Sequence, residues 1–460
     1  MKENTLMAPE SPLISSGLPA LDLVLGGGLH SKQTALICGL PGTGKTALAA
    51  QIAFAHAAAG RPVVFATVGE SHGKLIDGLQ GFSFFDKERM GRDFYMVSAQ
   101  AWVKKGVKEL REVLVLSVRE RKARLLVLDG LNAVREAWKD EPQIRELVNE
   151  LGAGLAQSDC AALLTSAEPL STALTHPEAS AADAVIALSA ALHEGRRLRR
   201  LEVAKLIGRT GLDGEHAMGI DASGVRVWPR VESLRPPAVP KAGEERATIG
   251  VAELDKLLGG GLPAGRPTVV LGAPGTGKSA LAAHFAAAGP DRCVYLALRE
   301  QADGVRERAA AFGLPCSPDR LDVRAPETPE AGPDQLAGTL LEALDATKSK
   351  RAVIDGLSEL DRALPEGRRE PFLRGLAEQL RARRVTALVL CEGGESALES
   401  GRSAVADTVL HLRHAGVDGR VARLVTVLKL PGRYEPRVRE LRIGERGFSM
   451  REPIGYGGDR

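Results

Sequence analysis

One loop pattern occurs twice in this 460-residue chain and limits the folds that the chain can adopt. The copies are Gly39-Leu-Pro-Gly-Thr-Gly-Lys45-Thr46 and Gly272-Ala-Pro-Gly-Thr-Gly-Lys278-Ser279, so their lysines lie 278 − 45 = 233 residues apart. Each copy follows an apolar run and precedes an alanine-rich helical stretch. In that strand–loop–helix context the G-x-x-x-x-G-K-[ST] pattern binds phosphate groups. A glycine-rich turn before an ordinary helix is the alternative, and the recurrence argues against it.

The loop chemistry predicts which residues contact a nucleotide. Glycines let backbone N–H groups turn toward phosphate oxygens, and the helix that follows presents its positive end to the same oxygens. The lysine reaches the β- and γ-phosphates. The predicted cofactor-binding residues are Gly39, Pro41, Gly42, Thr43, Gly44, Lys45 and Thr46 in the first copy, and Gly272, Pro274, Gly275, Thr276, Gly277, Lys278 and Ser279 in the second.

Downstream of each loop, an apolar run ends in an aspartate, at Asp129 and at Asp355. Many strands end this way, but behind a phosphate loop the arrangement is typical of the Walker B carboxylate, which holds Mg²⁺ or its water. The hydroxyls of Thr46 and Ser279 are the expected partners in that site. We therefore predict ATP and Mg²⁺ as cofactors, with Thr46, Asp129, Ser279 and Asp355 as the metal-binding residues.

The repeat also predicts the domain organisation. Strand-like apolar runs alternate with helical stretches in both halves, which indicates βαβ units and a parallel sheet. The predicted fold class is α/β, with two tandem RecA-like domains, each a mostly parallel sheet flanked by helices. The expected boundaries are a mobile N-terminus 1–12, a first domain 13–232, a proline-rich linker 233–246, a second domain 247–445 and a short tail 446–460. A helix is expected over residues 74–85.

Composition limits the remaining possibilities. The net charge of +3 gives no general argument for a nucleic-acid partner. The five cysteines show no paired spacing, which favours buried thiols in a reducing compartment. No apolar run is long enough to cross a membrane, and no signal peptide is evident. We expect a cytoplasmic protein with no membrane association.

The two loops, their Gly-Gly-Gly-Leu lead-ins at 26–29 and 259–262, and the basic run Arg196–Arg200 followed by Lys205 resemble the KaiC family of tandem RecA-type ATPases. The resemblance covers about residues 13–445. It implies a homohexamer of two stacked rings with ATP at each subunit interface. A KaiB-like or other signalling protein is the partner that it suggests.

The sequence departs from the family at the catalytic base. KaiC-like proteins carry two adjacent glutamates after the second strand, and the first of them activates water or a substrate hydroxyl. Here the matching pairs are Gly69-Glu70 and Arg299-Glu300, so the first glutamate is absent from both domains. Glu70 and Glu300 are candidate bases. The alternative is that each carboxylate complements a helix dipole, and Arg299 is expected to crowd and neutralise Glu300.

A second departure concerns residues that act on a neighbouring subunit's γ-phosphate. The family carries Lys-x-Arg-Gly after the last core strand, whereas this chain reads Lys205-Leu-Ile-Gly-Arg209 and Lys429-Leu-Pro-Gly-Arg433. The resemblance implies that Lys205 and Lys429 keep the role. Arg209 and Arg433 are predicted to replace the arginine, with ordinary loop arginines as the alternative.

The family's adjacent serine and threonine phosphoacceptors correspond to Ser403 and Ala404, so one acceptor hydroxyl remains. We expect weak or absent autokinase activity, and Ser403 is as readily an ordinary loop serine. The predicted function is a slowly hydrolysing, KaiC-like hexameric ATPase that acts as a conformational timer or switch in a signalling assembly. Two alternatives are an ATP-gated ring scaffold without useful hydrolysis and a DNA-stimulated RecA-like ATPase, although a solvated basic strand explains Arg196–Arg200 without nucleic acid.

Overall fold

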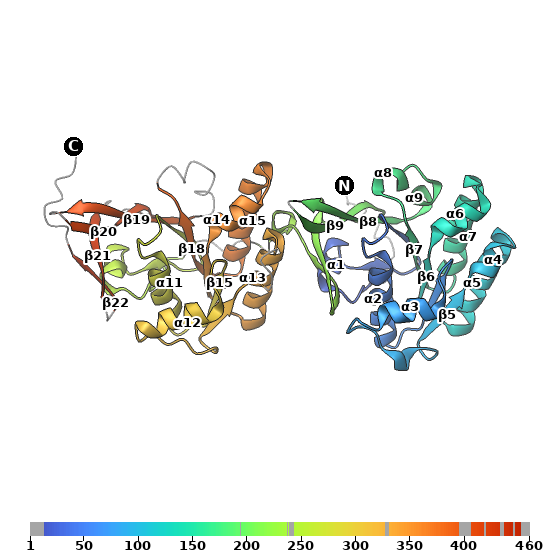
Figure 1. Cartoon of the computed structure of the whole chain (residues 1–460), viewed down its shortest axis with the longest axis horizontal. Coiled ribbons are helices and arrows are strands. Elements are labelled where there is room, and N and C mark those ends of the chain that lie inside the picture. Colours follow the sequence, from blue (N-terminus) through green and yellow to red (C-terminus); the bar gives the residue numbers. More distant parts are fainter. Residues whose placement is uncertain are drawn as a thin grey trace, which may run out of the picture. The chain divides into compact units, whose positions relative to one another are not determined.

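The computed structural model describes residues 13–193, 195–236, 238, 243–326, 331–394, 406–417, 420–432, 437–444 and 447–451. Its contacts divide the chain into two compact units, Met1–Arg230 and Val231–Arg460 (Figure 1). Among the described residues, each unit contains one nine-stranded sheet and one small two-stranded sheet. The prediction of two α/β domains with mostly parallel sheets is confirmed.

In the first unit, the order of the large sheet is β11-β10-β9-β8-β3-β7-β6-β4-β5, with parallel pairing from β8 to β5 and antiparallel pairing from β8 to β11. The strands are β1 Leu13–Ile14, β2 Leu29–His30, β3 Thr34–Cys38, β4 Val63–Thr67, β5 Phe94–Ser98, β6 Leu125–Asp129, β7 Ala161–Ser166, β8 Ala184–His193, β9 Arg196–Leu206, β10 His216–Asp221 and β11 Gly224–Trp228. The helices are α1 Pro19–Val24, α2 Lys45–Ala58, α3 His72–Leu79, α4 Gln100–Val103, α5 Val107–Arg121, α6 Leu131–Trp138, α7 Glu141–Ala156, α8 Leu170–Ala173 and α9 Pro177–Ala181.

The second unit repeats this topology in the order β16-β15-β17-β18-β14-β19-β20-β21-β22, with antiparallel pairing from β19 to β22. The strands are β12 Arg246–Ala247, β13 Leu262–Pro263, β14 Pro267–Gly272, β15 Cys293–Ala297, β16 Leu321–Arg324, β17 Arg351–Asp355, β18 Thr386–Glu392, β19 Thr408–Val417, β20 Arg420–Lys429, β21 Val438–Gly444 and β22 Gly447–Arg451. The helices are α10 Ala252–Leu257, α11 Lys278–Ala287, α12 Ala302–Ala311, α13 Pro333–Thr347, α14 Leu357–Ala363 and α15 Glu366–Ala382.

Both central sheets are covered on two faces, which explains their apolar composition. Every residue of β3, β4 and β6 is buried, as expected for parallel strands between two helical layers. Helices α1 to α3 pack on one face of the first sheet, and α5, α6 and α7 pack on the other. In the second unit, α10 to α12 and α13 to α15 form the corresponding layers. The carboxyl ends of the parallel strands in each sheet therefore meet at one edge.

The repeated lead-in to each phosphate loop has a structural explanation. Asp22 accepts hydrogen bonds from the Ser15 hydroxyl (2.5 Å) and the Ser16 amide (2.7 Å). Asp255 accepts the same pair of bonds from Thr248 (2.5 Å) and Ile249 (2.8 Å). In both units the aspartate thus ties the chain entering the domain to the first helix.

Three segments differ from the sequence expectations. The helix predicted over 74–85 begins at His72, where Ser71 accepts a hydrogen bond from the amide of Lys74, and ends at Leu79. Val231 and Glu232, the last two residues of the predicted first domain, group with the second unit. Strand β22 lies within the segment predicted as a tail and pairs with β21.

Glu232 is held by a buried charge cluster of the second unit. The Arg368 guanidinium, on α15, donates to Glu232 (2.7 Å) and to Asp334 (2.8 Å), and Asp334 is 2% exposed.

Among the described residues, no helix is both long enough and apolar enough to cross a membrane.

Candidate functional site

The two phosphate loops adopt the same backbone conformation at corresponding sheet positions. Each connects a central strand, β3 or β14, to the helix that begins at the loop lysine. Gly44 has φ +106° and Gly277 has φ +104°, a conformation that a side chain disfavours. A Cβ atom on Gly39 would lie 2.2 Å from the carbonyl oxygen of Leu188. The glycines at these loop positions are therefore required by the backbone.

The loop lysines point back into their own loops. Lys45 Nζ donates to the carbonyl oxygen of Leu40 (3.1 Å), and Lys278 Nζ donates to those of Gly272 (2.7 Å) and Ala273 (2.9 Å). Burial lowers the pKa of both ammonium groups, because desolvation disfavours the charged form. An anionic phosphate in the loop would stabilise that charge.

The first unit brings its predicted metal-binding residues together. Thr46 Oγ1 lies 3.1 Å and 3.3 Å from the two carboxylate oxygens of Asp129, which is 8% exposed at the end of β6. Thr165, at the end of the adjacent strand β7, donates to Asp129 at 2.5 Å. A hydroxyl facing an oriented carboxylate is the donor set that Mg²⁺ takes alongside phosphate oxygens, so Thr46 and Asp129 fit this ion.

The second unit surrounds its Walker B residue differently. Asp355 accepts a 2.7 Å hydrogen bond from the hydroxyl of Tyr295, which lies fully buried on β15. Burial is the main cause that raises the pKa of Tyr295 well above its usual value, so this hydroxyl stays protonated and donates. The counterpart of Tyr295 in the first unit is Phe65. Thr67 pairs with Asp129 and Ala297 pairs with Asp355, and Phe65 and Tyr295 each lie two residues before these partners. The other carboxylate oxygen of Asp355 is left available for a metal, and Ser279 is the second residue of α11.

The two candidate bases lie in different environments. Glu70 forms a loose ion pair with Lys74, at 3.9 Å, and the Lys74 side chain is 80% exposed. Glu300 accepts two 2.6 Å hydrogen bonds from the guanidinium of Arg308. Such bidentate pairs are among the strongest that a carboxylate forms. The residue eight positions after Glu70, which corresponds to Arg308, is Gly78.

The expectation that Arg299 neutralises Glu300 is wrong. Arg299 instead bonds two other carboxylates, through Nε and Nη2 to Glu359 (3.1 Å and 2.9 Å) and through Nη1 to Glu392. The cation that bonds Glu300 is Arg308. Glu300 lies just before α12 and Arg308 lies on it, and residues eight positions apart fall near the same face of a helix.

The predicted trans-acting residues contact carbonyl groups of their own chain. Lys205 Nζ donates to Ala179 (3.1 Å), Ser180 (2.8 Å) and Ala182 (2.6 Å) at the end of α9, and Lys429 Nζ donates to Ala406 (2.8 Å). The Arg209 guanidinium donates to the carbonyl of Gly28 in the glycine-rich lead-in, and burial lowers its pKa. Arg433 and Ser403 lie outside the described residues.

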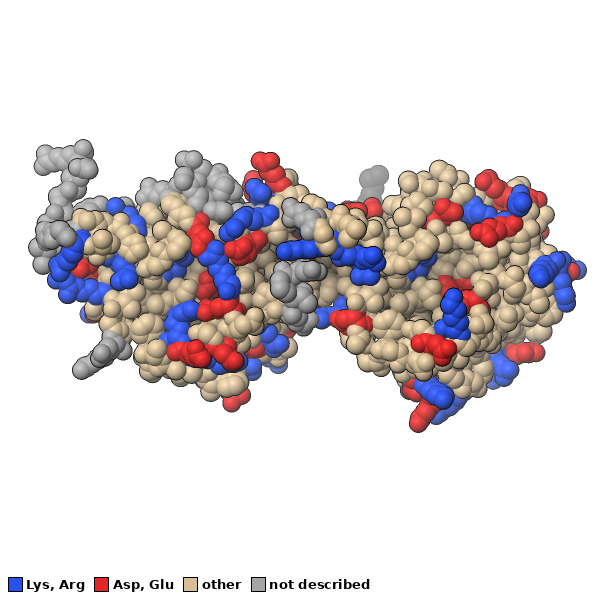
Figure 2. Space-filling model, in the orientation of Figure 1, with Lys and Arg blue, Asp and Glu red and all other residues tan. Residues whose placement is uncertain are grey.

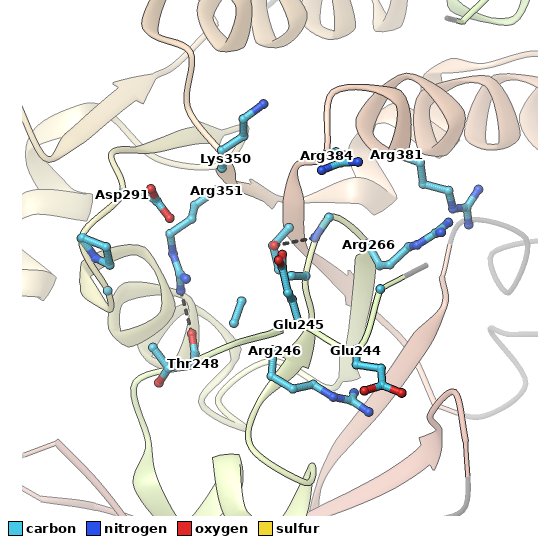
Figure 3. A pocket seen from close by; sticks show the side chains of 17 residues that line it. Glu244, Glu245, Arg246, Thr248, Arg266, Asp291, Lys350, Arg351, Arg381 and Arg384 are labelled. Atoms are coloured by element: carbon cyan, nitrogen blue, oxygen red, sulfur yellow. Dashed lines mark hydrogen bonds between the residues drawn. The ribbon is translucent and has the colours of Figure 1, made fainter. Parts of the chain in front are cut away.

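A cavity of about 830 Å³ lies at the opposite edge of the second sheet, where β14, β17 and β18 begin (Figure 3). Its lining includes six basic residues, Arg246, Arg266, Lys350, Arg351, Arg381 and Arg384. No residue of the phosphate loop lines it, so it is not the nucleotide site. Arg351 has a structural role there, because its guanidinium donates to Thr248 (2.8 Å) and Phe285 (2.7 Å) carbonyls and stacks on the Phe285 ring.

Sequence reasoning missed several residues around the loops. Thr165, Tyr295 and Arg308 contact the Walker B aspartates or a candidate base, and Glu359 and Glu392 hold Arg299. One signal was available for Glu392: it directly follows a predicted strand that neighbours the loop strand, where parallel strands end together. The Arg308 contact had a weaker signal, because a glutamate and an arginine eight residues apart lie on one face of a helix.

Comparisons with known proteins agree with the geometry. The family model for the KaiC ATPase matches residues 14–232 and again residues 247–453. The chain is 26% identical to a protein named circadian clock oscillator protein KaiC of Picosynechococcus sp. (strain ATCC 27264 / PCC 7002 / PR-6), over 95% of this chain and 89% of that protein. It is 25% identical to circadian clock protein KaiC3 of Synechocystis sp. (strain ATCC 27184 / PCC 6803 / Kazusa), over 96% of this chain and 92% of that protein.

Proposed function

The chain belongs to the KaiC family of ATPases, and on that premise we propose that it is a slow ATPase whose two units divide the work. The first unit hydrolyses ATP with Glu70 as the general base. The second unit binds ATP and retains it. ATP binding with Mg²⁺ is general to phosphate-loop ATPases of this family, and the division of work is the part specific to this chain.

The observation that carries the proposal is the contrast between the two glutamates. A general base must be free to accept a proton from water at about 2.6–3.2 Å, or through one intervening water. Glu70 is about a third exposed, and among the described residues its ion-pair partner is the distant, solvated Lys74. Glu300 is 23% exposed and fully engaged by Arg308, so its oxygens face a cation that must leave before they can accept a proton.

The residues of the first unit support a simple mechanism. Backbone N–H groups of the glycine-rich loop and Lys45 would hold the phosphates of ATP, and Thr46 and Asp129 would hold Mg²⁺, which would supply positive charge against the phosphates. Glu70 orients a water molecule toward the γ-phosphorus and accepts its proton. Thr165 keeps the Asp129 carboxylate oriented through its 2.5 Å hydrogen bond. The products are ADP and inorganic phosphate.

Assembly is the second part of the proposal. We expect a homohexamer with ATP at subunit interfaces, in which Lys205 and Arg209 of one subunit approach the nucleotide of the next. In the single chain both side chains bond carbonyl groups of their own chain, so they would exchange those partners for phosphate oxygens on assembly. By analogy with relatives named as clock proteins, the ring would act as a conformational timer or switch with a KaiB-like or other signalling partner.

Analysis of bound nucleotide tests the division of work. After incubation with ATP and Mg²⁺, the Lys278→Ala protein, which keeps only the first loop, should contain mainly ADP. The Lys45→Ala protein should contain mainly ATP. Light scattering of the unmutated protein with ATP should give a mass near six chains, and a monomer at saturating ATP would refute the assembly.

Two other functions would give different results in the same assays. An ATP-gated scaffold without hydrolysis would leave ATP intact in both lysine variants. A DNA-stimulated ATPase would release phosphate faster when DNA is added. On the face in view in Figure 2, basic and acidic side chains are interspersed over both units, which does not favour a nucleic-acid surface.

A further inference from the structure

Arg299 and the two glutamates that it bonds lie at the edge of the second nucleotide site, outside the residues that the proposed mechanism uses. A fourth charged side chain, Arg362 of α14, also donates to Glu359, at 3.0 Å. Arg299 follows strand β15, Glu359 lies on α14, and Glu392 ends β18. Glu359 accepts from Nε and Nη2 of the guanidinium at 3.1 Å and 2.9 Å, and Glu392 accepts from Nη1. The three side chains are between 28% and 39% exposed, so solvent reaches the network.

The first unit has none of the three. The sheet registers pair Thr67 with Asp129 and Ala297 with Asp355, so the residue corresponding to Arg299 is Gly69. Glu359 lies four residues after Asp355, and the residue four positions after Asp129 is Ala133, so Glu359 corresponds to Ala133. A Cβ atom on Gly69 would lie 3.7 Å from that of Ala133, which places the two positions side by side in the first unit as well.

The third position follows from the strand beside the phosphate loop. Cys38 pairs with Ser166 and Leu271 pairs with Cys391, so Glu392 corresponds to Ala167. Three adjacent positions thus carry an arginine and two glutamates in one domain, and glycine and two alanines in its repeat. A surface ion pair could be lost or gained one residue at a time without consequence. A complete three-residue network confined to one nucleotide site indicates a function there.

The network adjoins the phosphate loop. Glu392 pairs with Gly272, the first residue of the phosphate loop, in the register of β14 and β18. The Lys278 ammonium donates to the carbonyl oxygen of the same Gly272 at 2.7 Å, and Arg299 donates to Glu392 on the other side. Lys278, Glu392 and Arg299 therefore lie in sequence from the place where the β- and γ-phosphates bind.

We propose that Arg299, Glu359 and Glu392 form a γ-phosphate sensor in the second unit. When ATP occupies the loop, its γ-phosphate competes with the two carboxylates for the guanidinium, and Arg299 binds the phosphate. ADP has no γ-phosphate, so Arg299 stays on Glu359 and Glu392. The second unit would then bind ATP in preference to ADP by a single charge exchange, and its nucleotide state would be visible at α14 through Glu359.

This inference rests on the proposed function in one respect, the retention of ATP by the second unit, and it deepens that proposal by naming how the site recognises ATP. No bond forms or breaks in the exchange. The guanidinium is suited to it, because its planar set of donors can bind either a carboxylate or a phosphate in a bidentate manner.

Nucleotide affinities of the full chain test the sensor. We use the Lys45→Ala background, so that only the second loop binds, and measure the Kd of fluorescent ATP and ADP analogues with Mg²⁺. Arg299→Gln should weaken ATP by about tenfold or more, the loss of charge-assisted hydrogen bonds, and change ADP by less than about twofold. Glu359→Gln with Glu392→Gln should act in the opposite direction and tighten ATP severalfold, because Arg299 is released.

Arg306→Gln is the matched control. Arg306 is also partly exposed and bonds Asp303 at 3.5 Å, away from the network, so its removal should leave both affinities unchanged. If the network only stabilised the fold, Arg299→Gln would lower the melting temperature and leave the ratio of the ATP and ADP affinities as it was. An unchanged ratio, or weaker ATP binding by the double glutamine variant, would overturn the sensor. Neither result depends on hydrolysis by the first unit, which the Lys278→Ala protein reports separately.

Discussion

Replacing each candidate base by its amide gives the sharpest contrast between the two units. We expect Glu70→Gln in the Lys278→Ala background to lower phosphate release by roughly 10²- to 10⁴-fold, the usual contribution of a general base. Glutamine keeps the size of the side chain and cannot accept the proton. The loss of phosphate release would therefore reflect chemistry rather than packing.

The corresponding change in the second unit, Glu300→Gln in the Lys45→Ala background, should lower an already small phosphate release by a factor roughly 30 to 150 times smaller than the factor for Glu70→Gln. The structure sets this limit. Arg308 donates two 2.6 Å hydrogen bonds to Glu300, and freeing the carboxylate costs roughly 2–3 kcal/mol when the partial exposure of both groups is considered. Only about one molecule in 30 to 150 then has Glu300 available as a base.

Phosphate release at saturating ATP measures both effects, and binding of a fluorescent ATP analogue to each double variant confirms that the remaining loop still binds nucleotide. Arg308→Ala in the Lys45→Ala background completes the set, because it frees Glu300 and should raise release if nothing else in the second site blocks the reaction. If Glu70→Gln left release unchanged while Glu300→Gln abolished it, the assignment of the bases would be refuted.

Three further predictions concern stability and the second metal site. Arg368→Ala should lower the free energy of unfolding of the second unit by about 3–5 kcal/mol in urea titrations, because it removes the cation that two buried carboxylates share; a loss below 1 kcal/mol would contradict this. Burial lowers the pKa of His56 to about 4, below its unfolded value, so stability should fall by on the order of 3 kcal/mol as the pH drops from 6.5 toward 4. His56→Gln should reduce that pH dependence, and an unaltered profile would argue against the assignment. In the Lys45→Ala background, Tyr295→Phe should change the Mg²⁺ dependence of ATP binding, because it removes the hydroxyl that bonds Asp355; an identical Mg²⁺ titration would show that this contact does not tune the site.

Much of the fold followed from the sequence because the signals were local. Fully buried parallel strands read as continuous apolar runs, and the predicted strand 125–129 matches β6 residue for residue. The internal repeat predicted two domains with the same order of strands and helices, as the two sheets show. The helix predicted over 74–85 extended too far, because Phe82, Phe84 and Phe85 continue the apolar pattern while they pack against the same core from outside the helix.

The phosphate loops followed from their motif, but the surroundings of the catalytic glutamates did not. Arg299 stands next to Glu300 in sequence, and adjacency suggested an ion pair between them. Successive side chains near the end of a strand point to opposite sides, so Arg299 faces Glu392 and Glu300 turns toward α12. Those contacts depend on which strands and helices the topology brings together, which a single sequence does not specify.

The division of ATP hydrolysis between the units is the central claim, and steady-state phosphate release by the two loop-lysine variants tests it most directly. We predict that Lys45→Ala removes most of the release, whereas Lys278→Ala keeps most of it, with both proteins shown to be folded by their circular dichroism. Equal losses in the two variants, or a larger loss in Lys278→Ala, would contradict the claim.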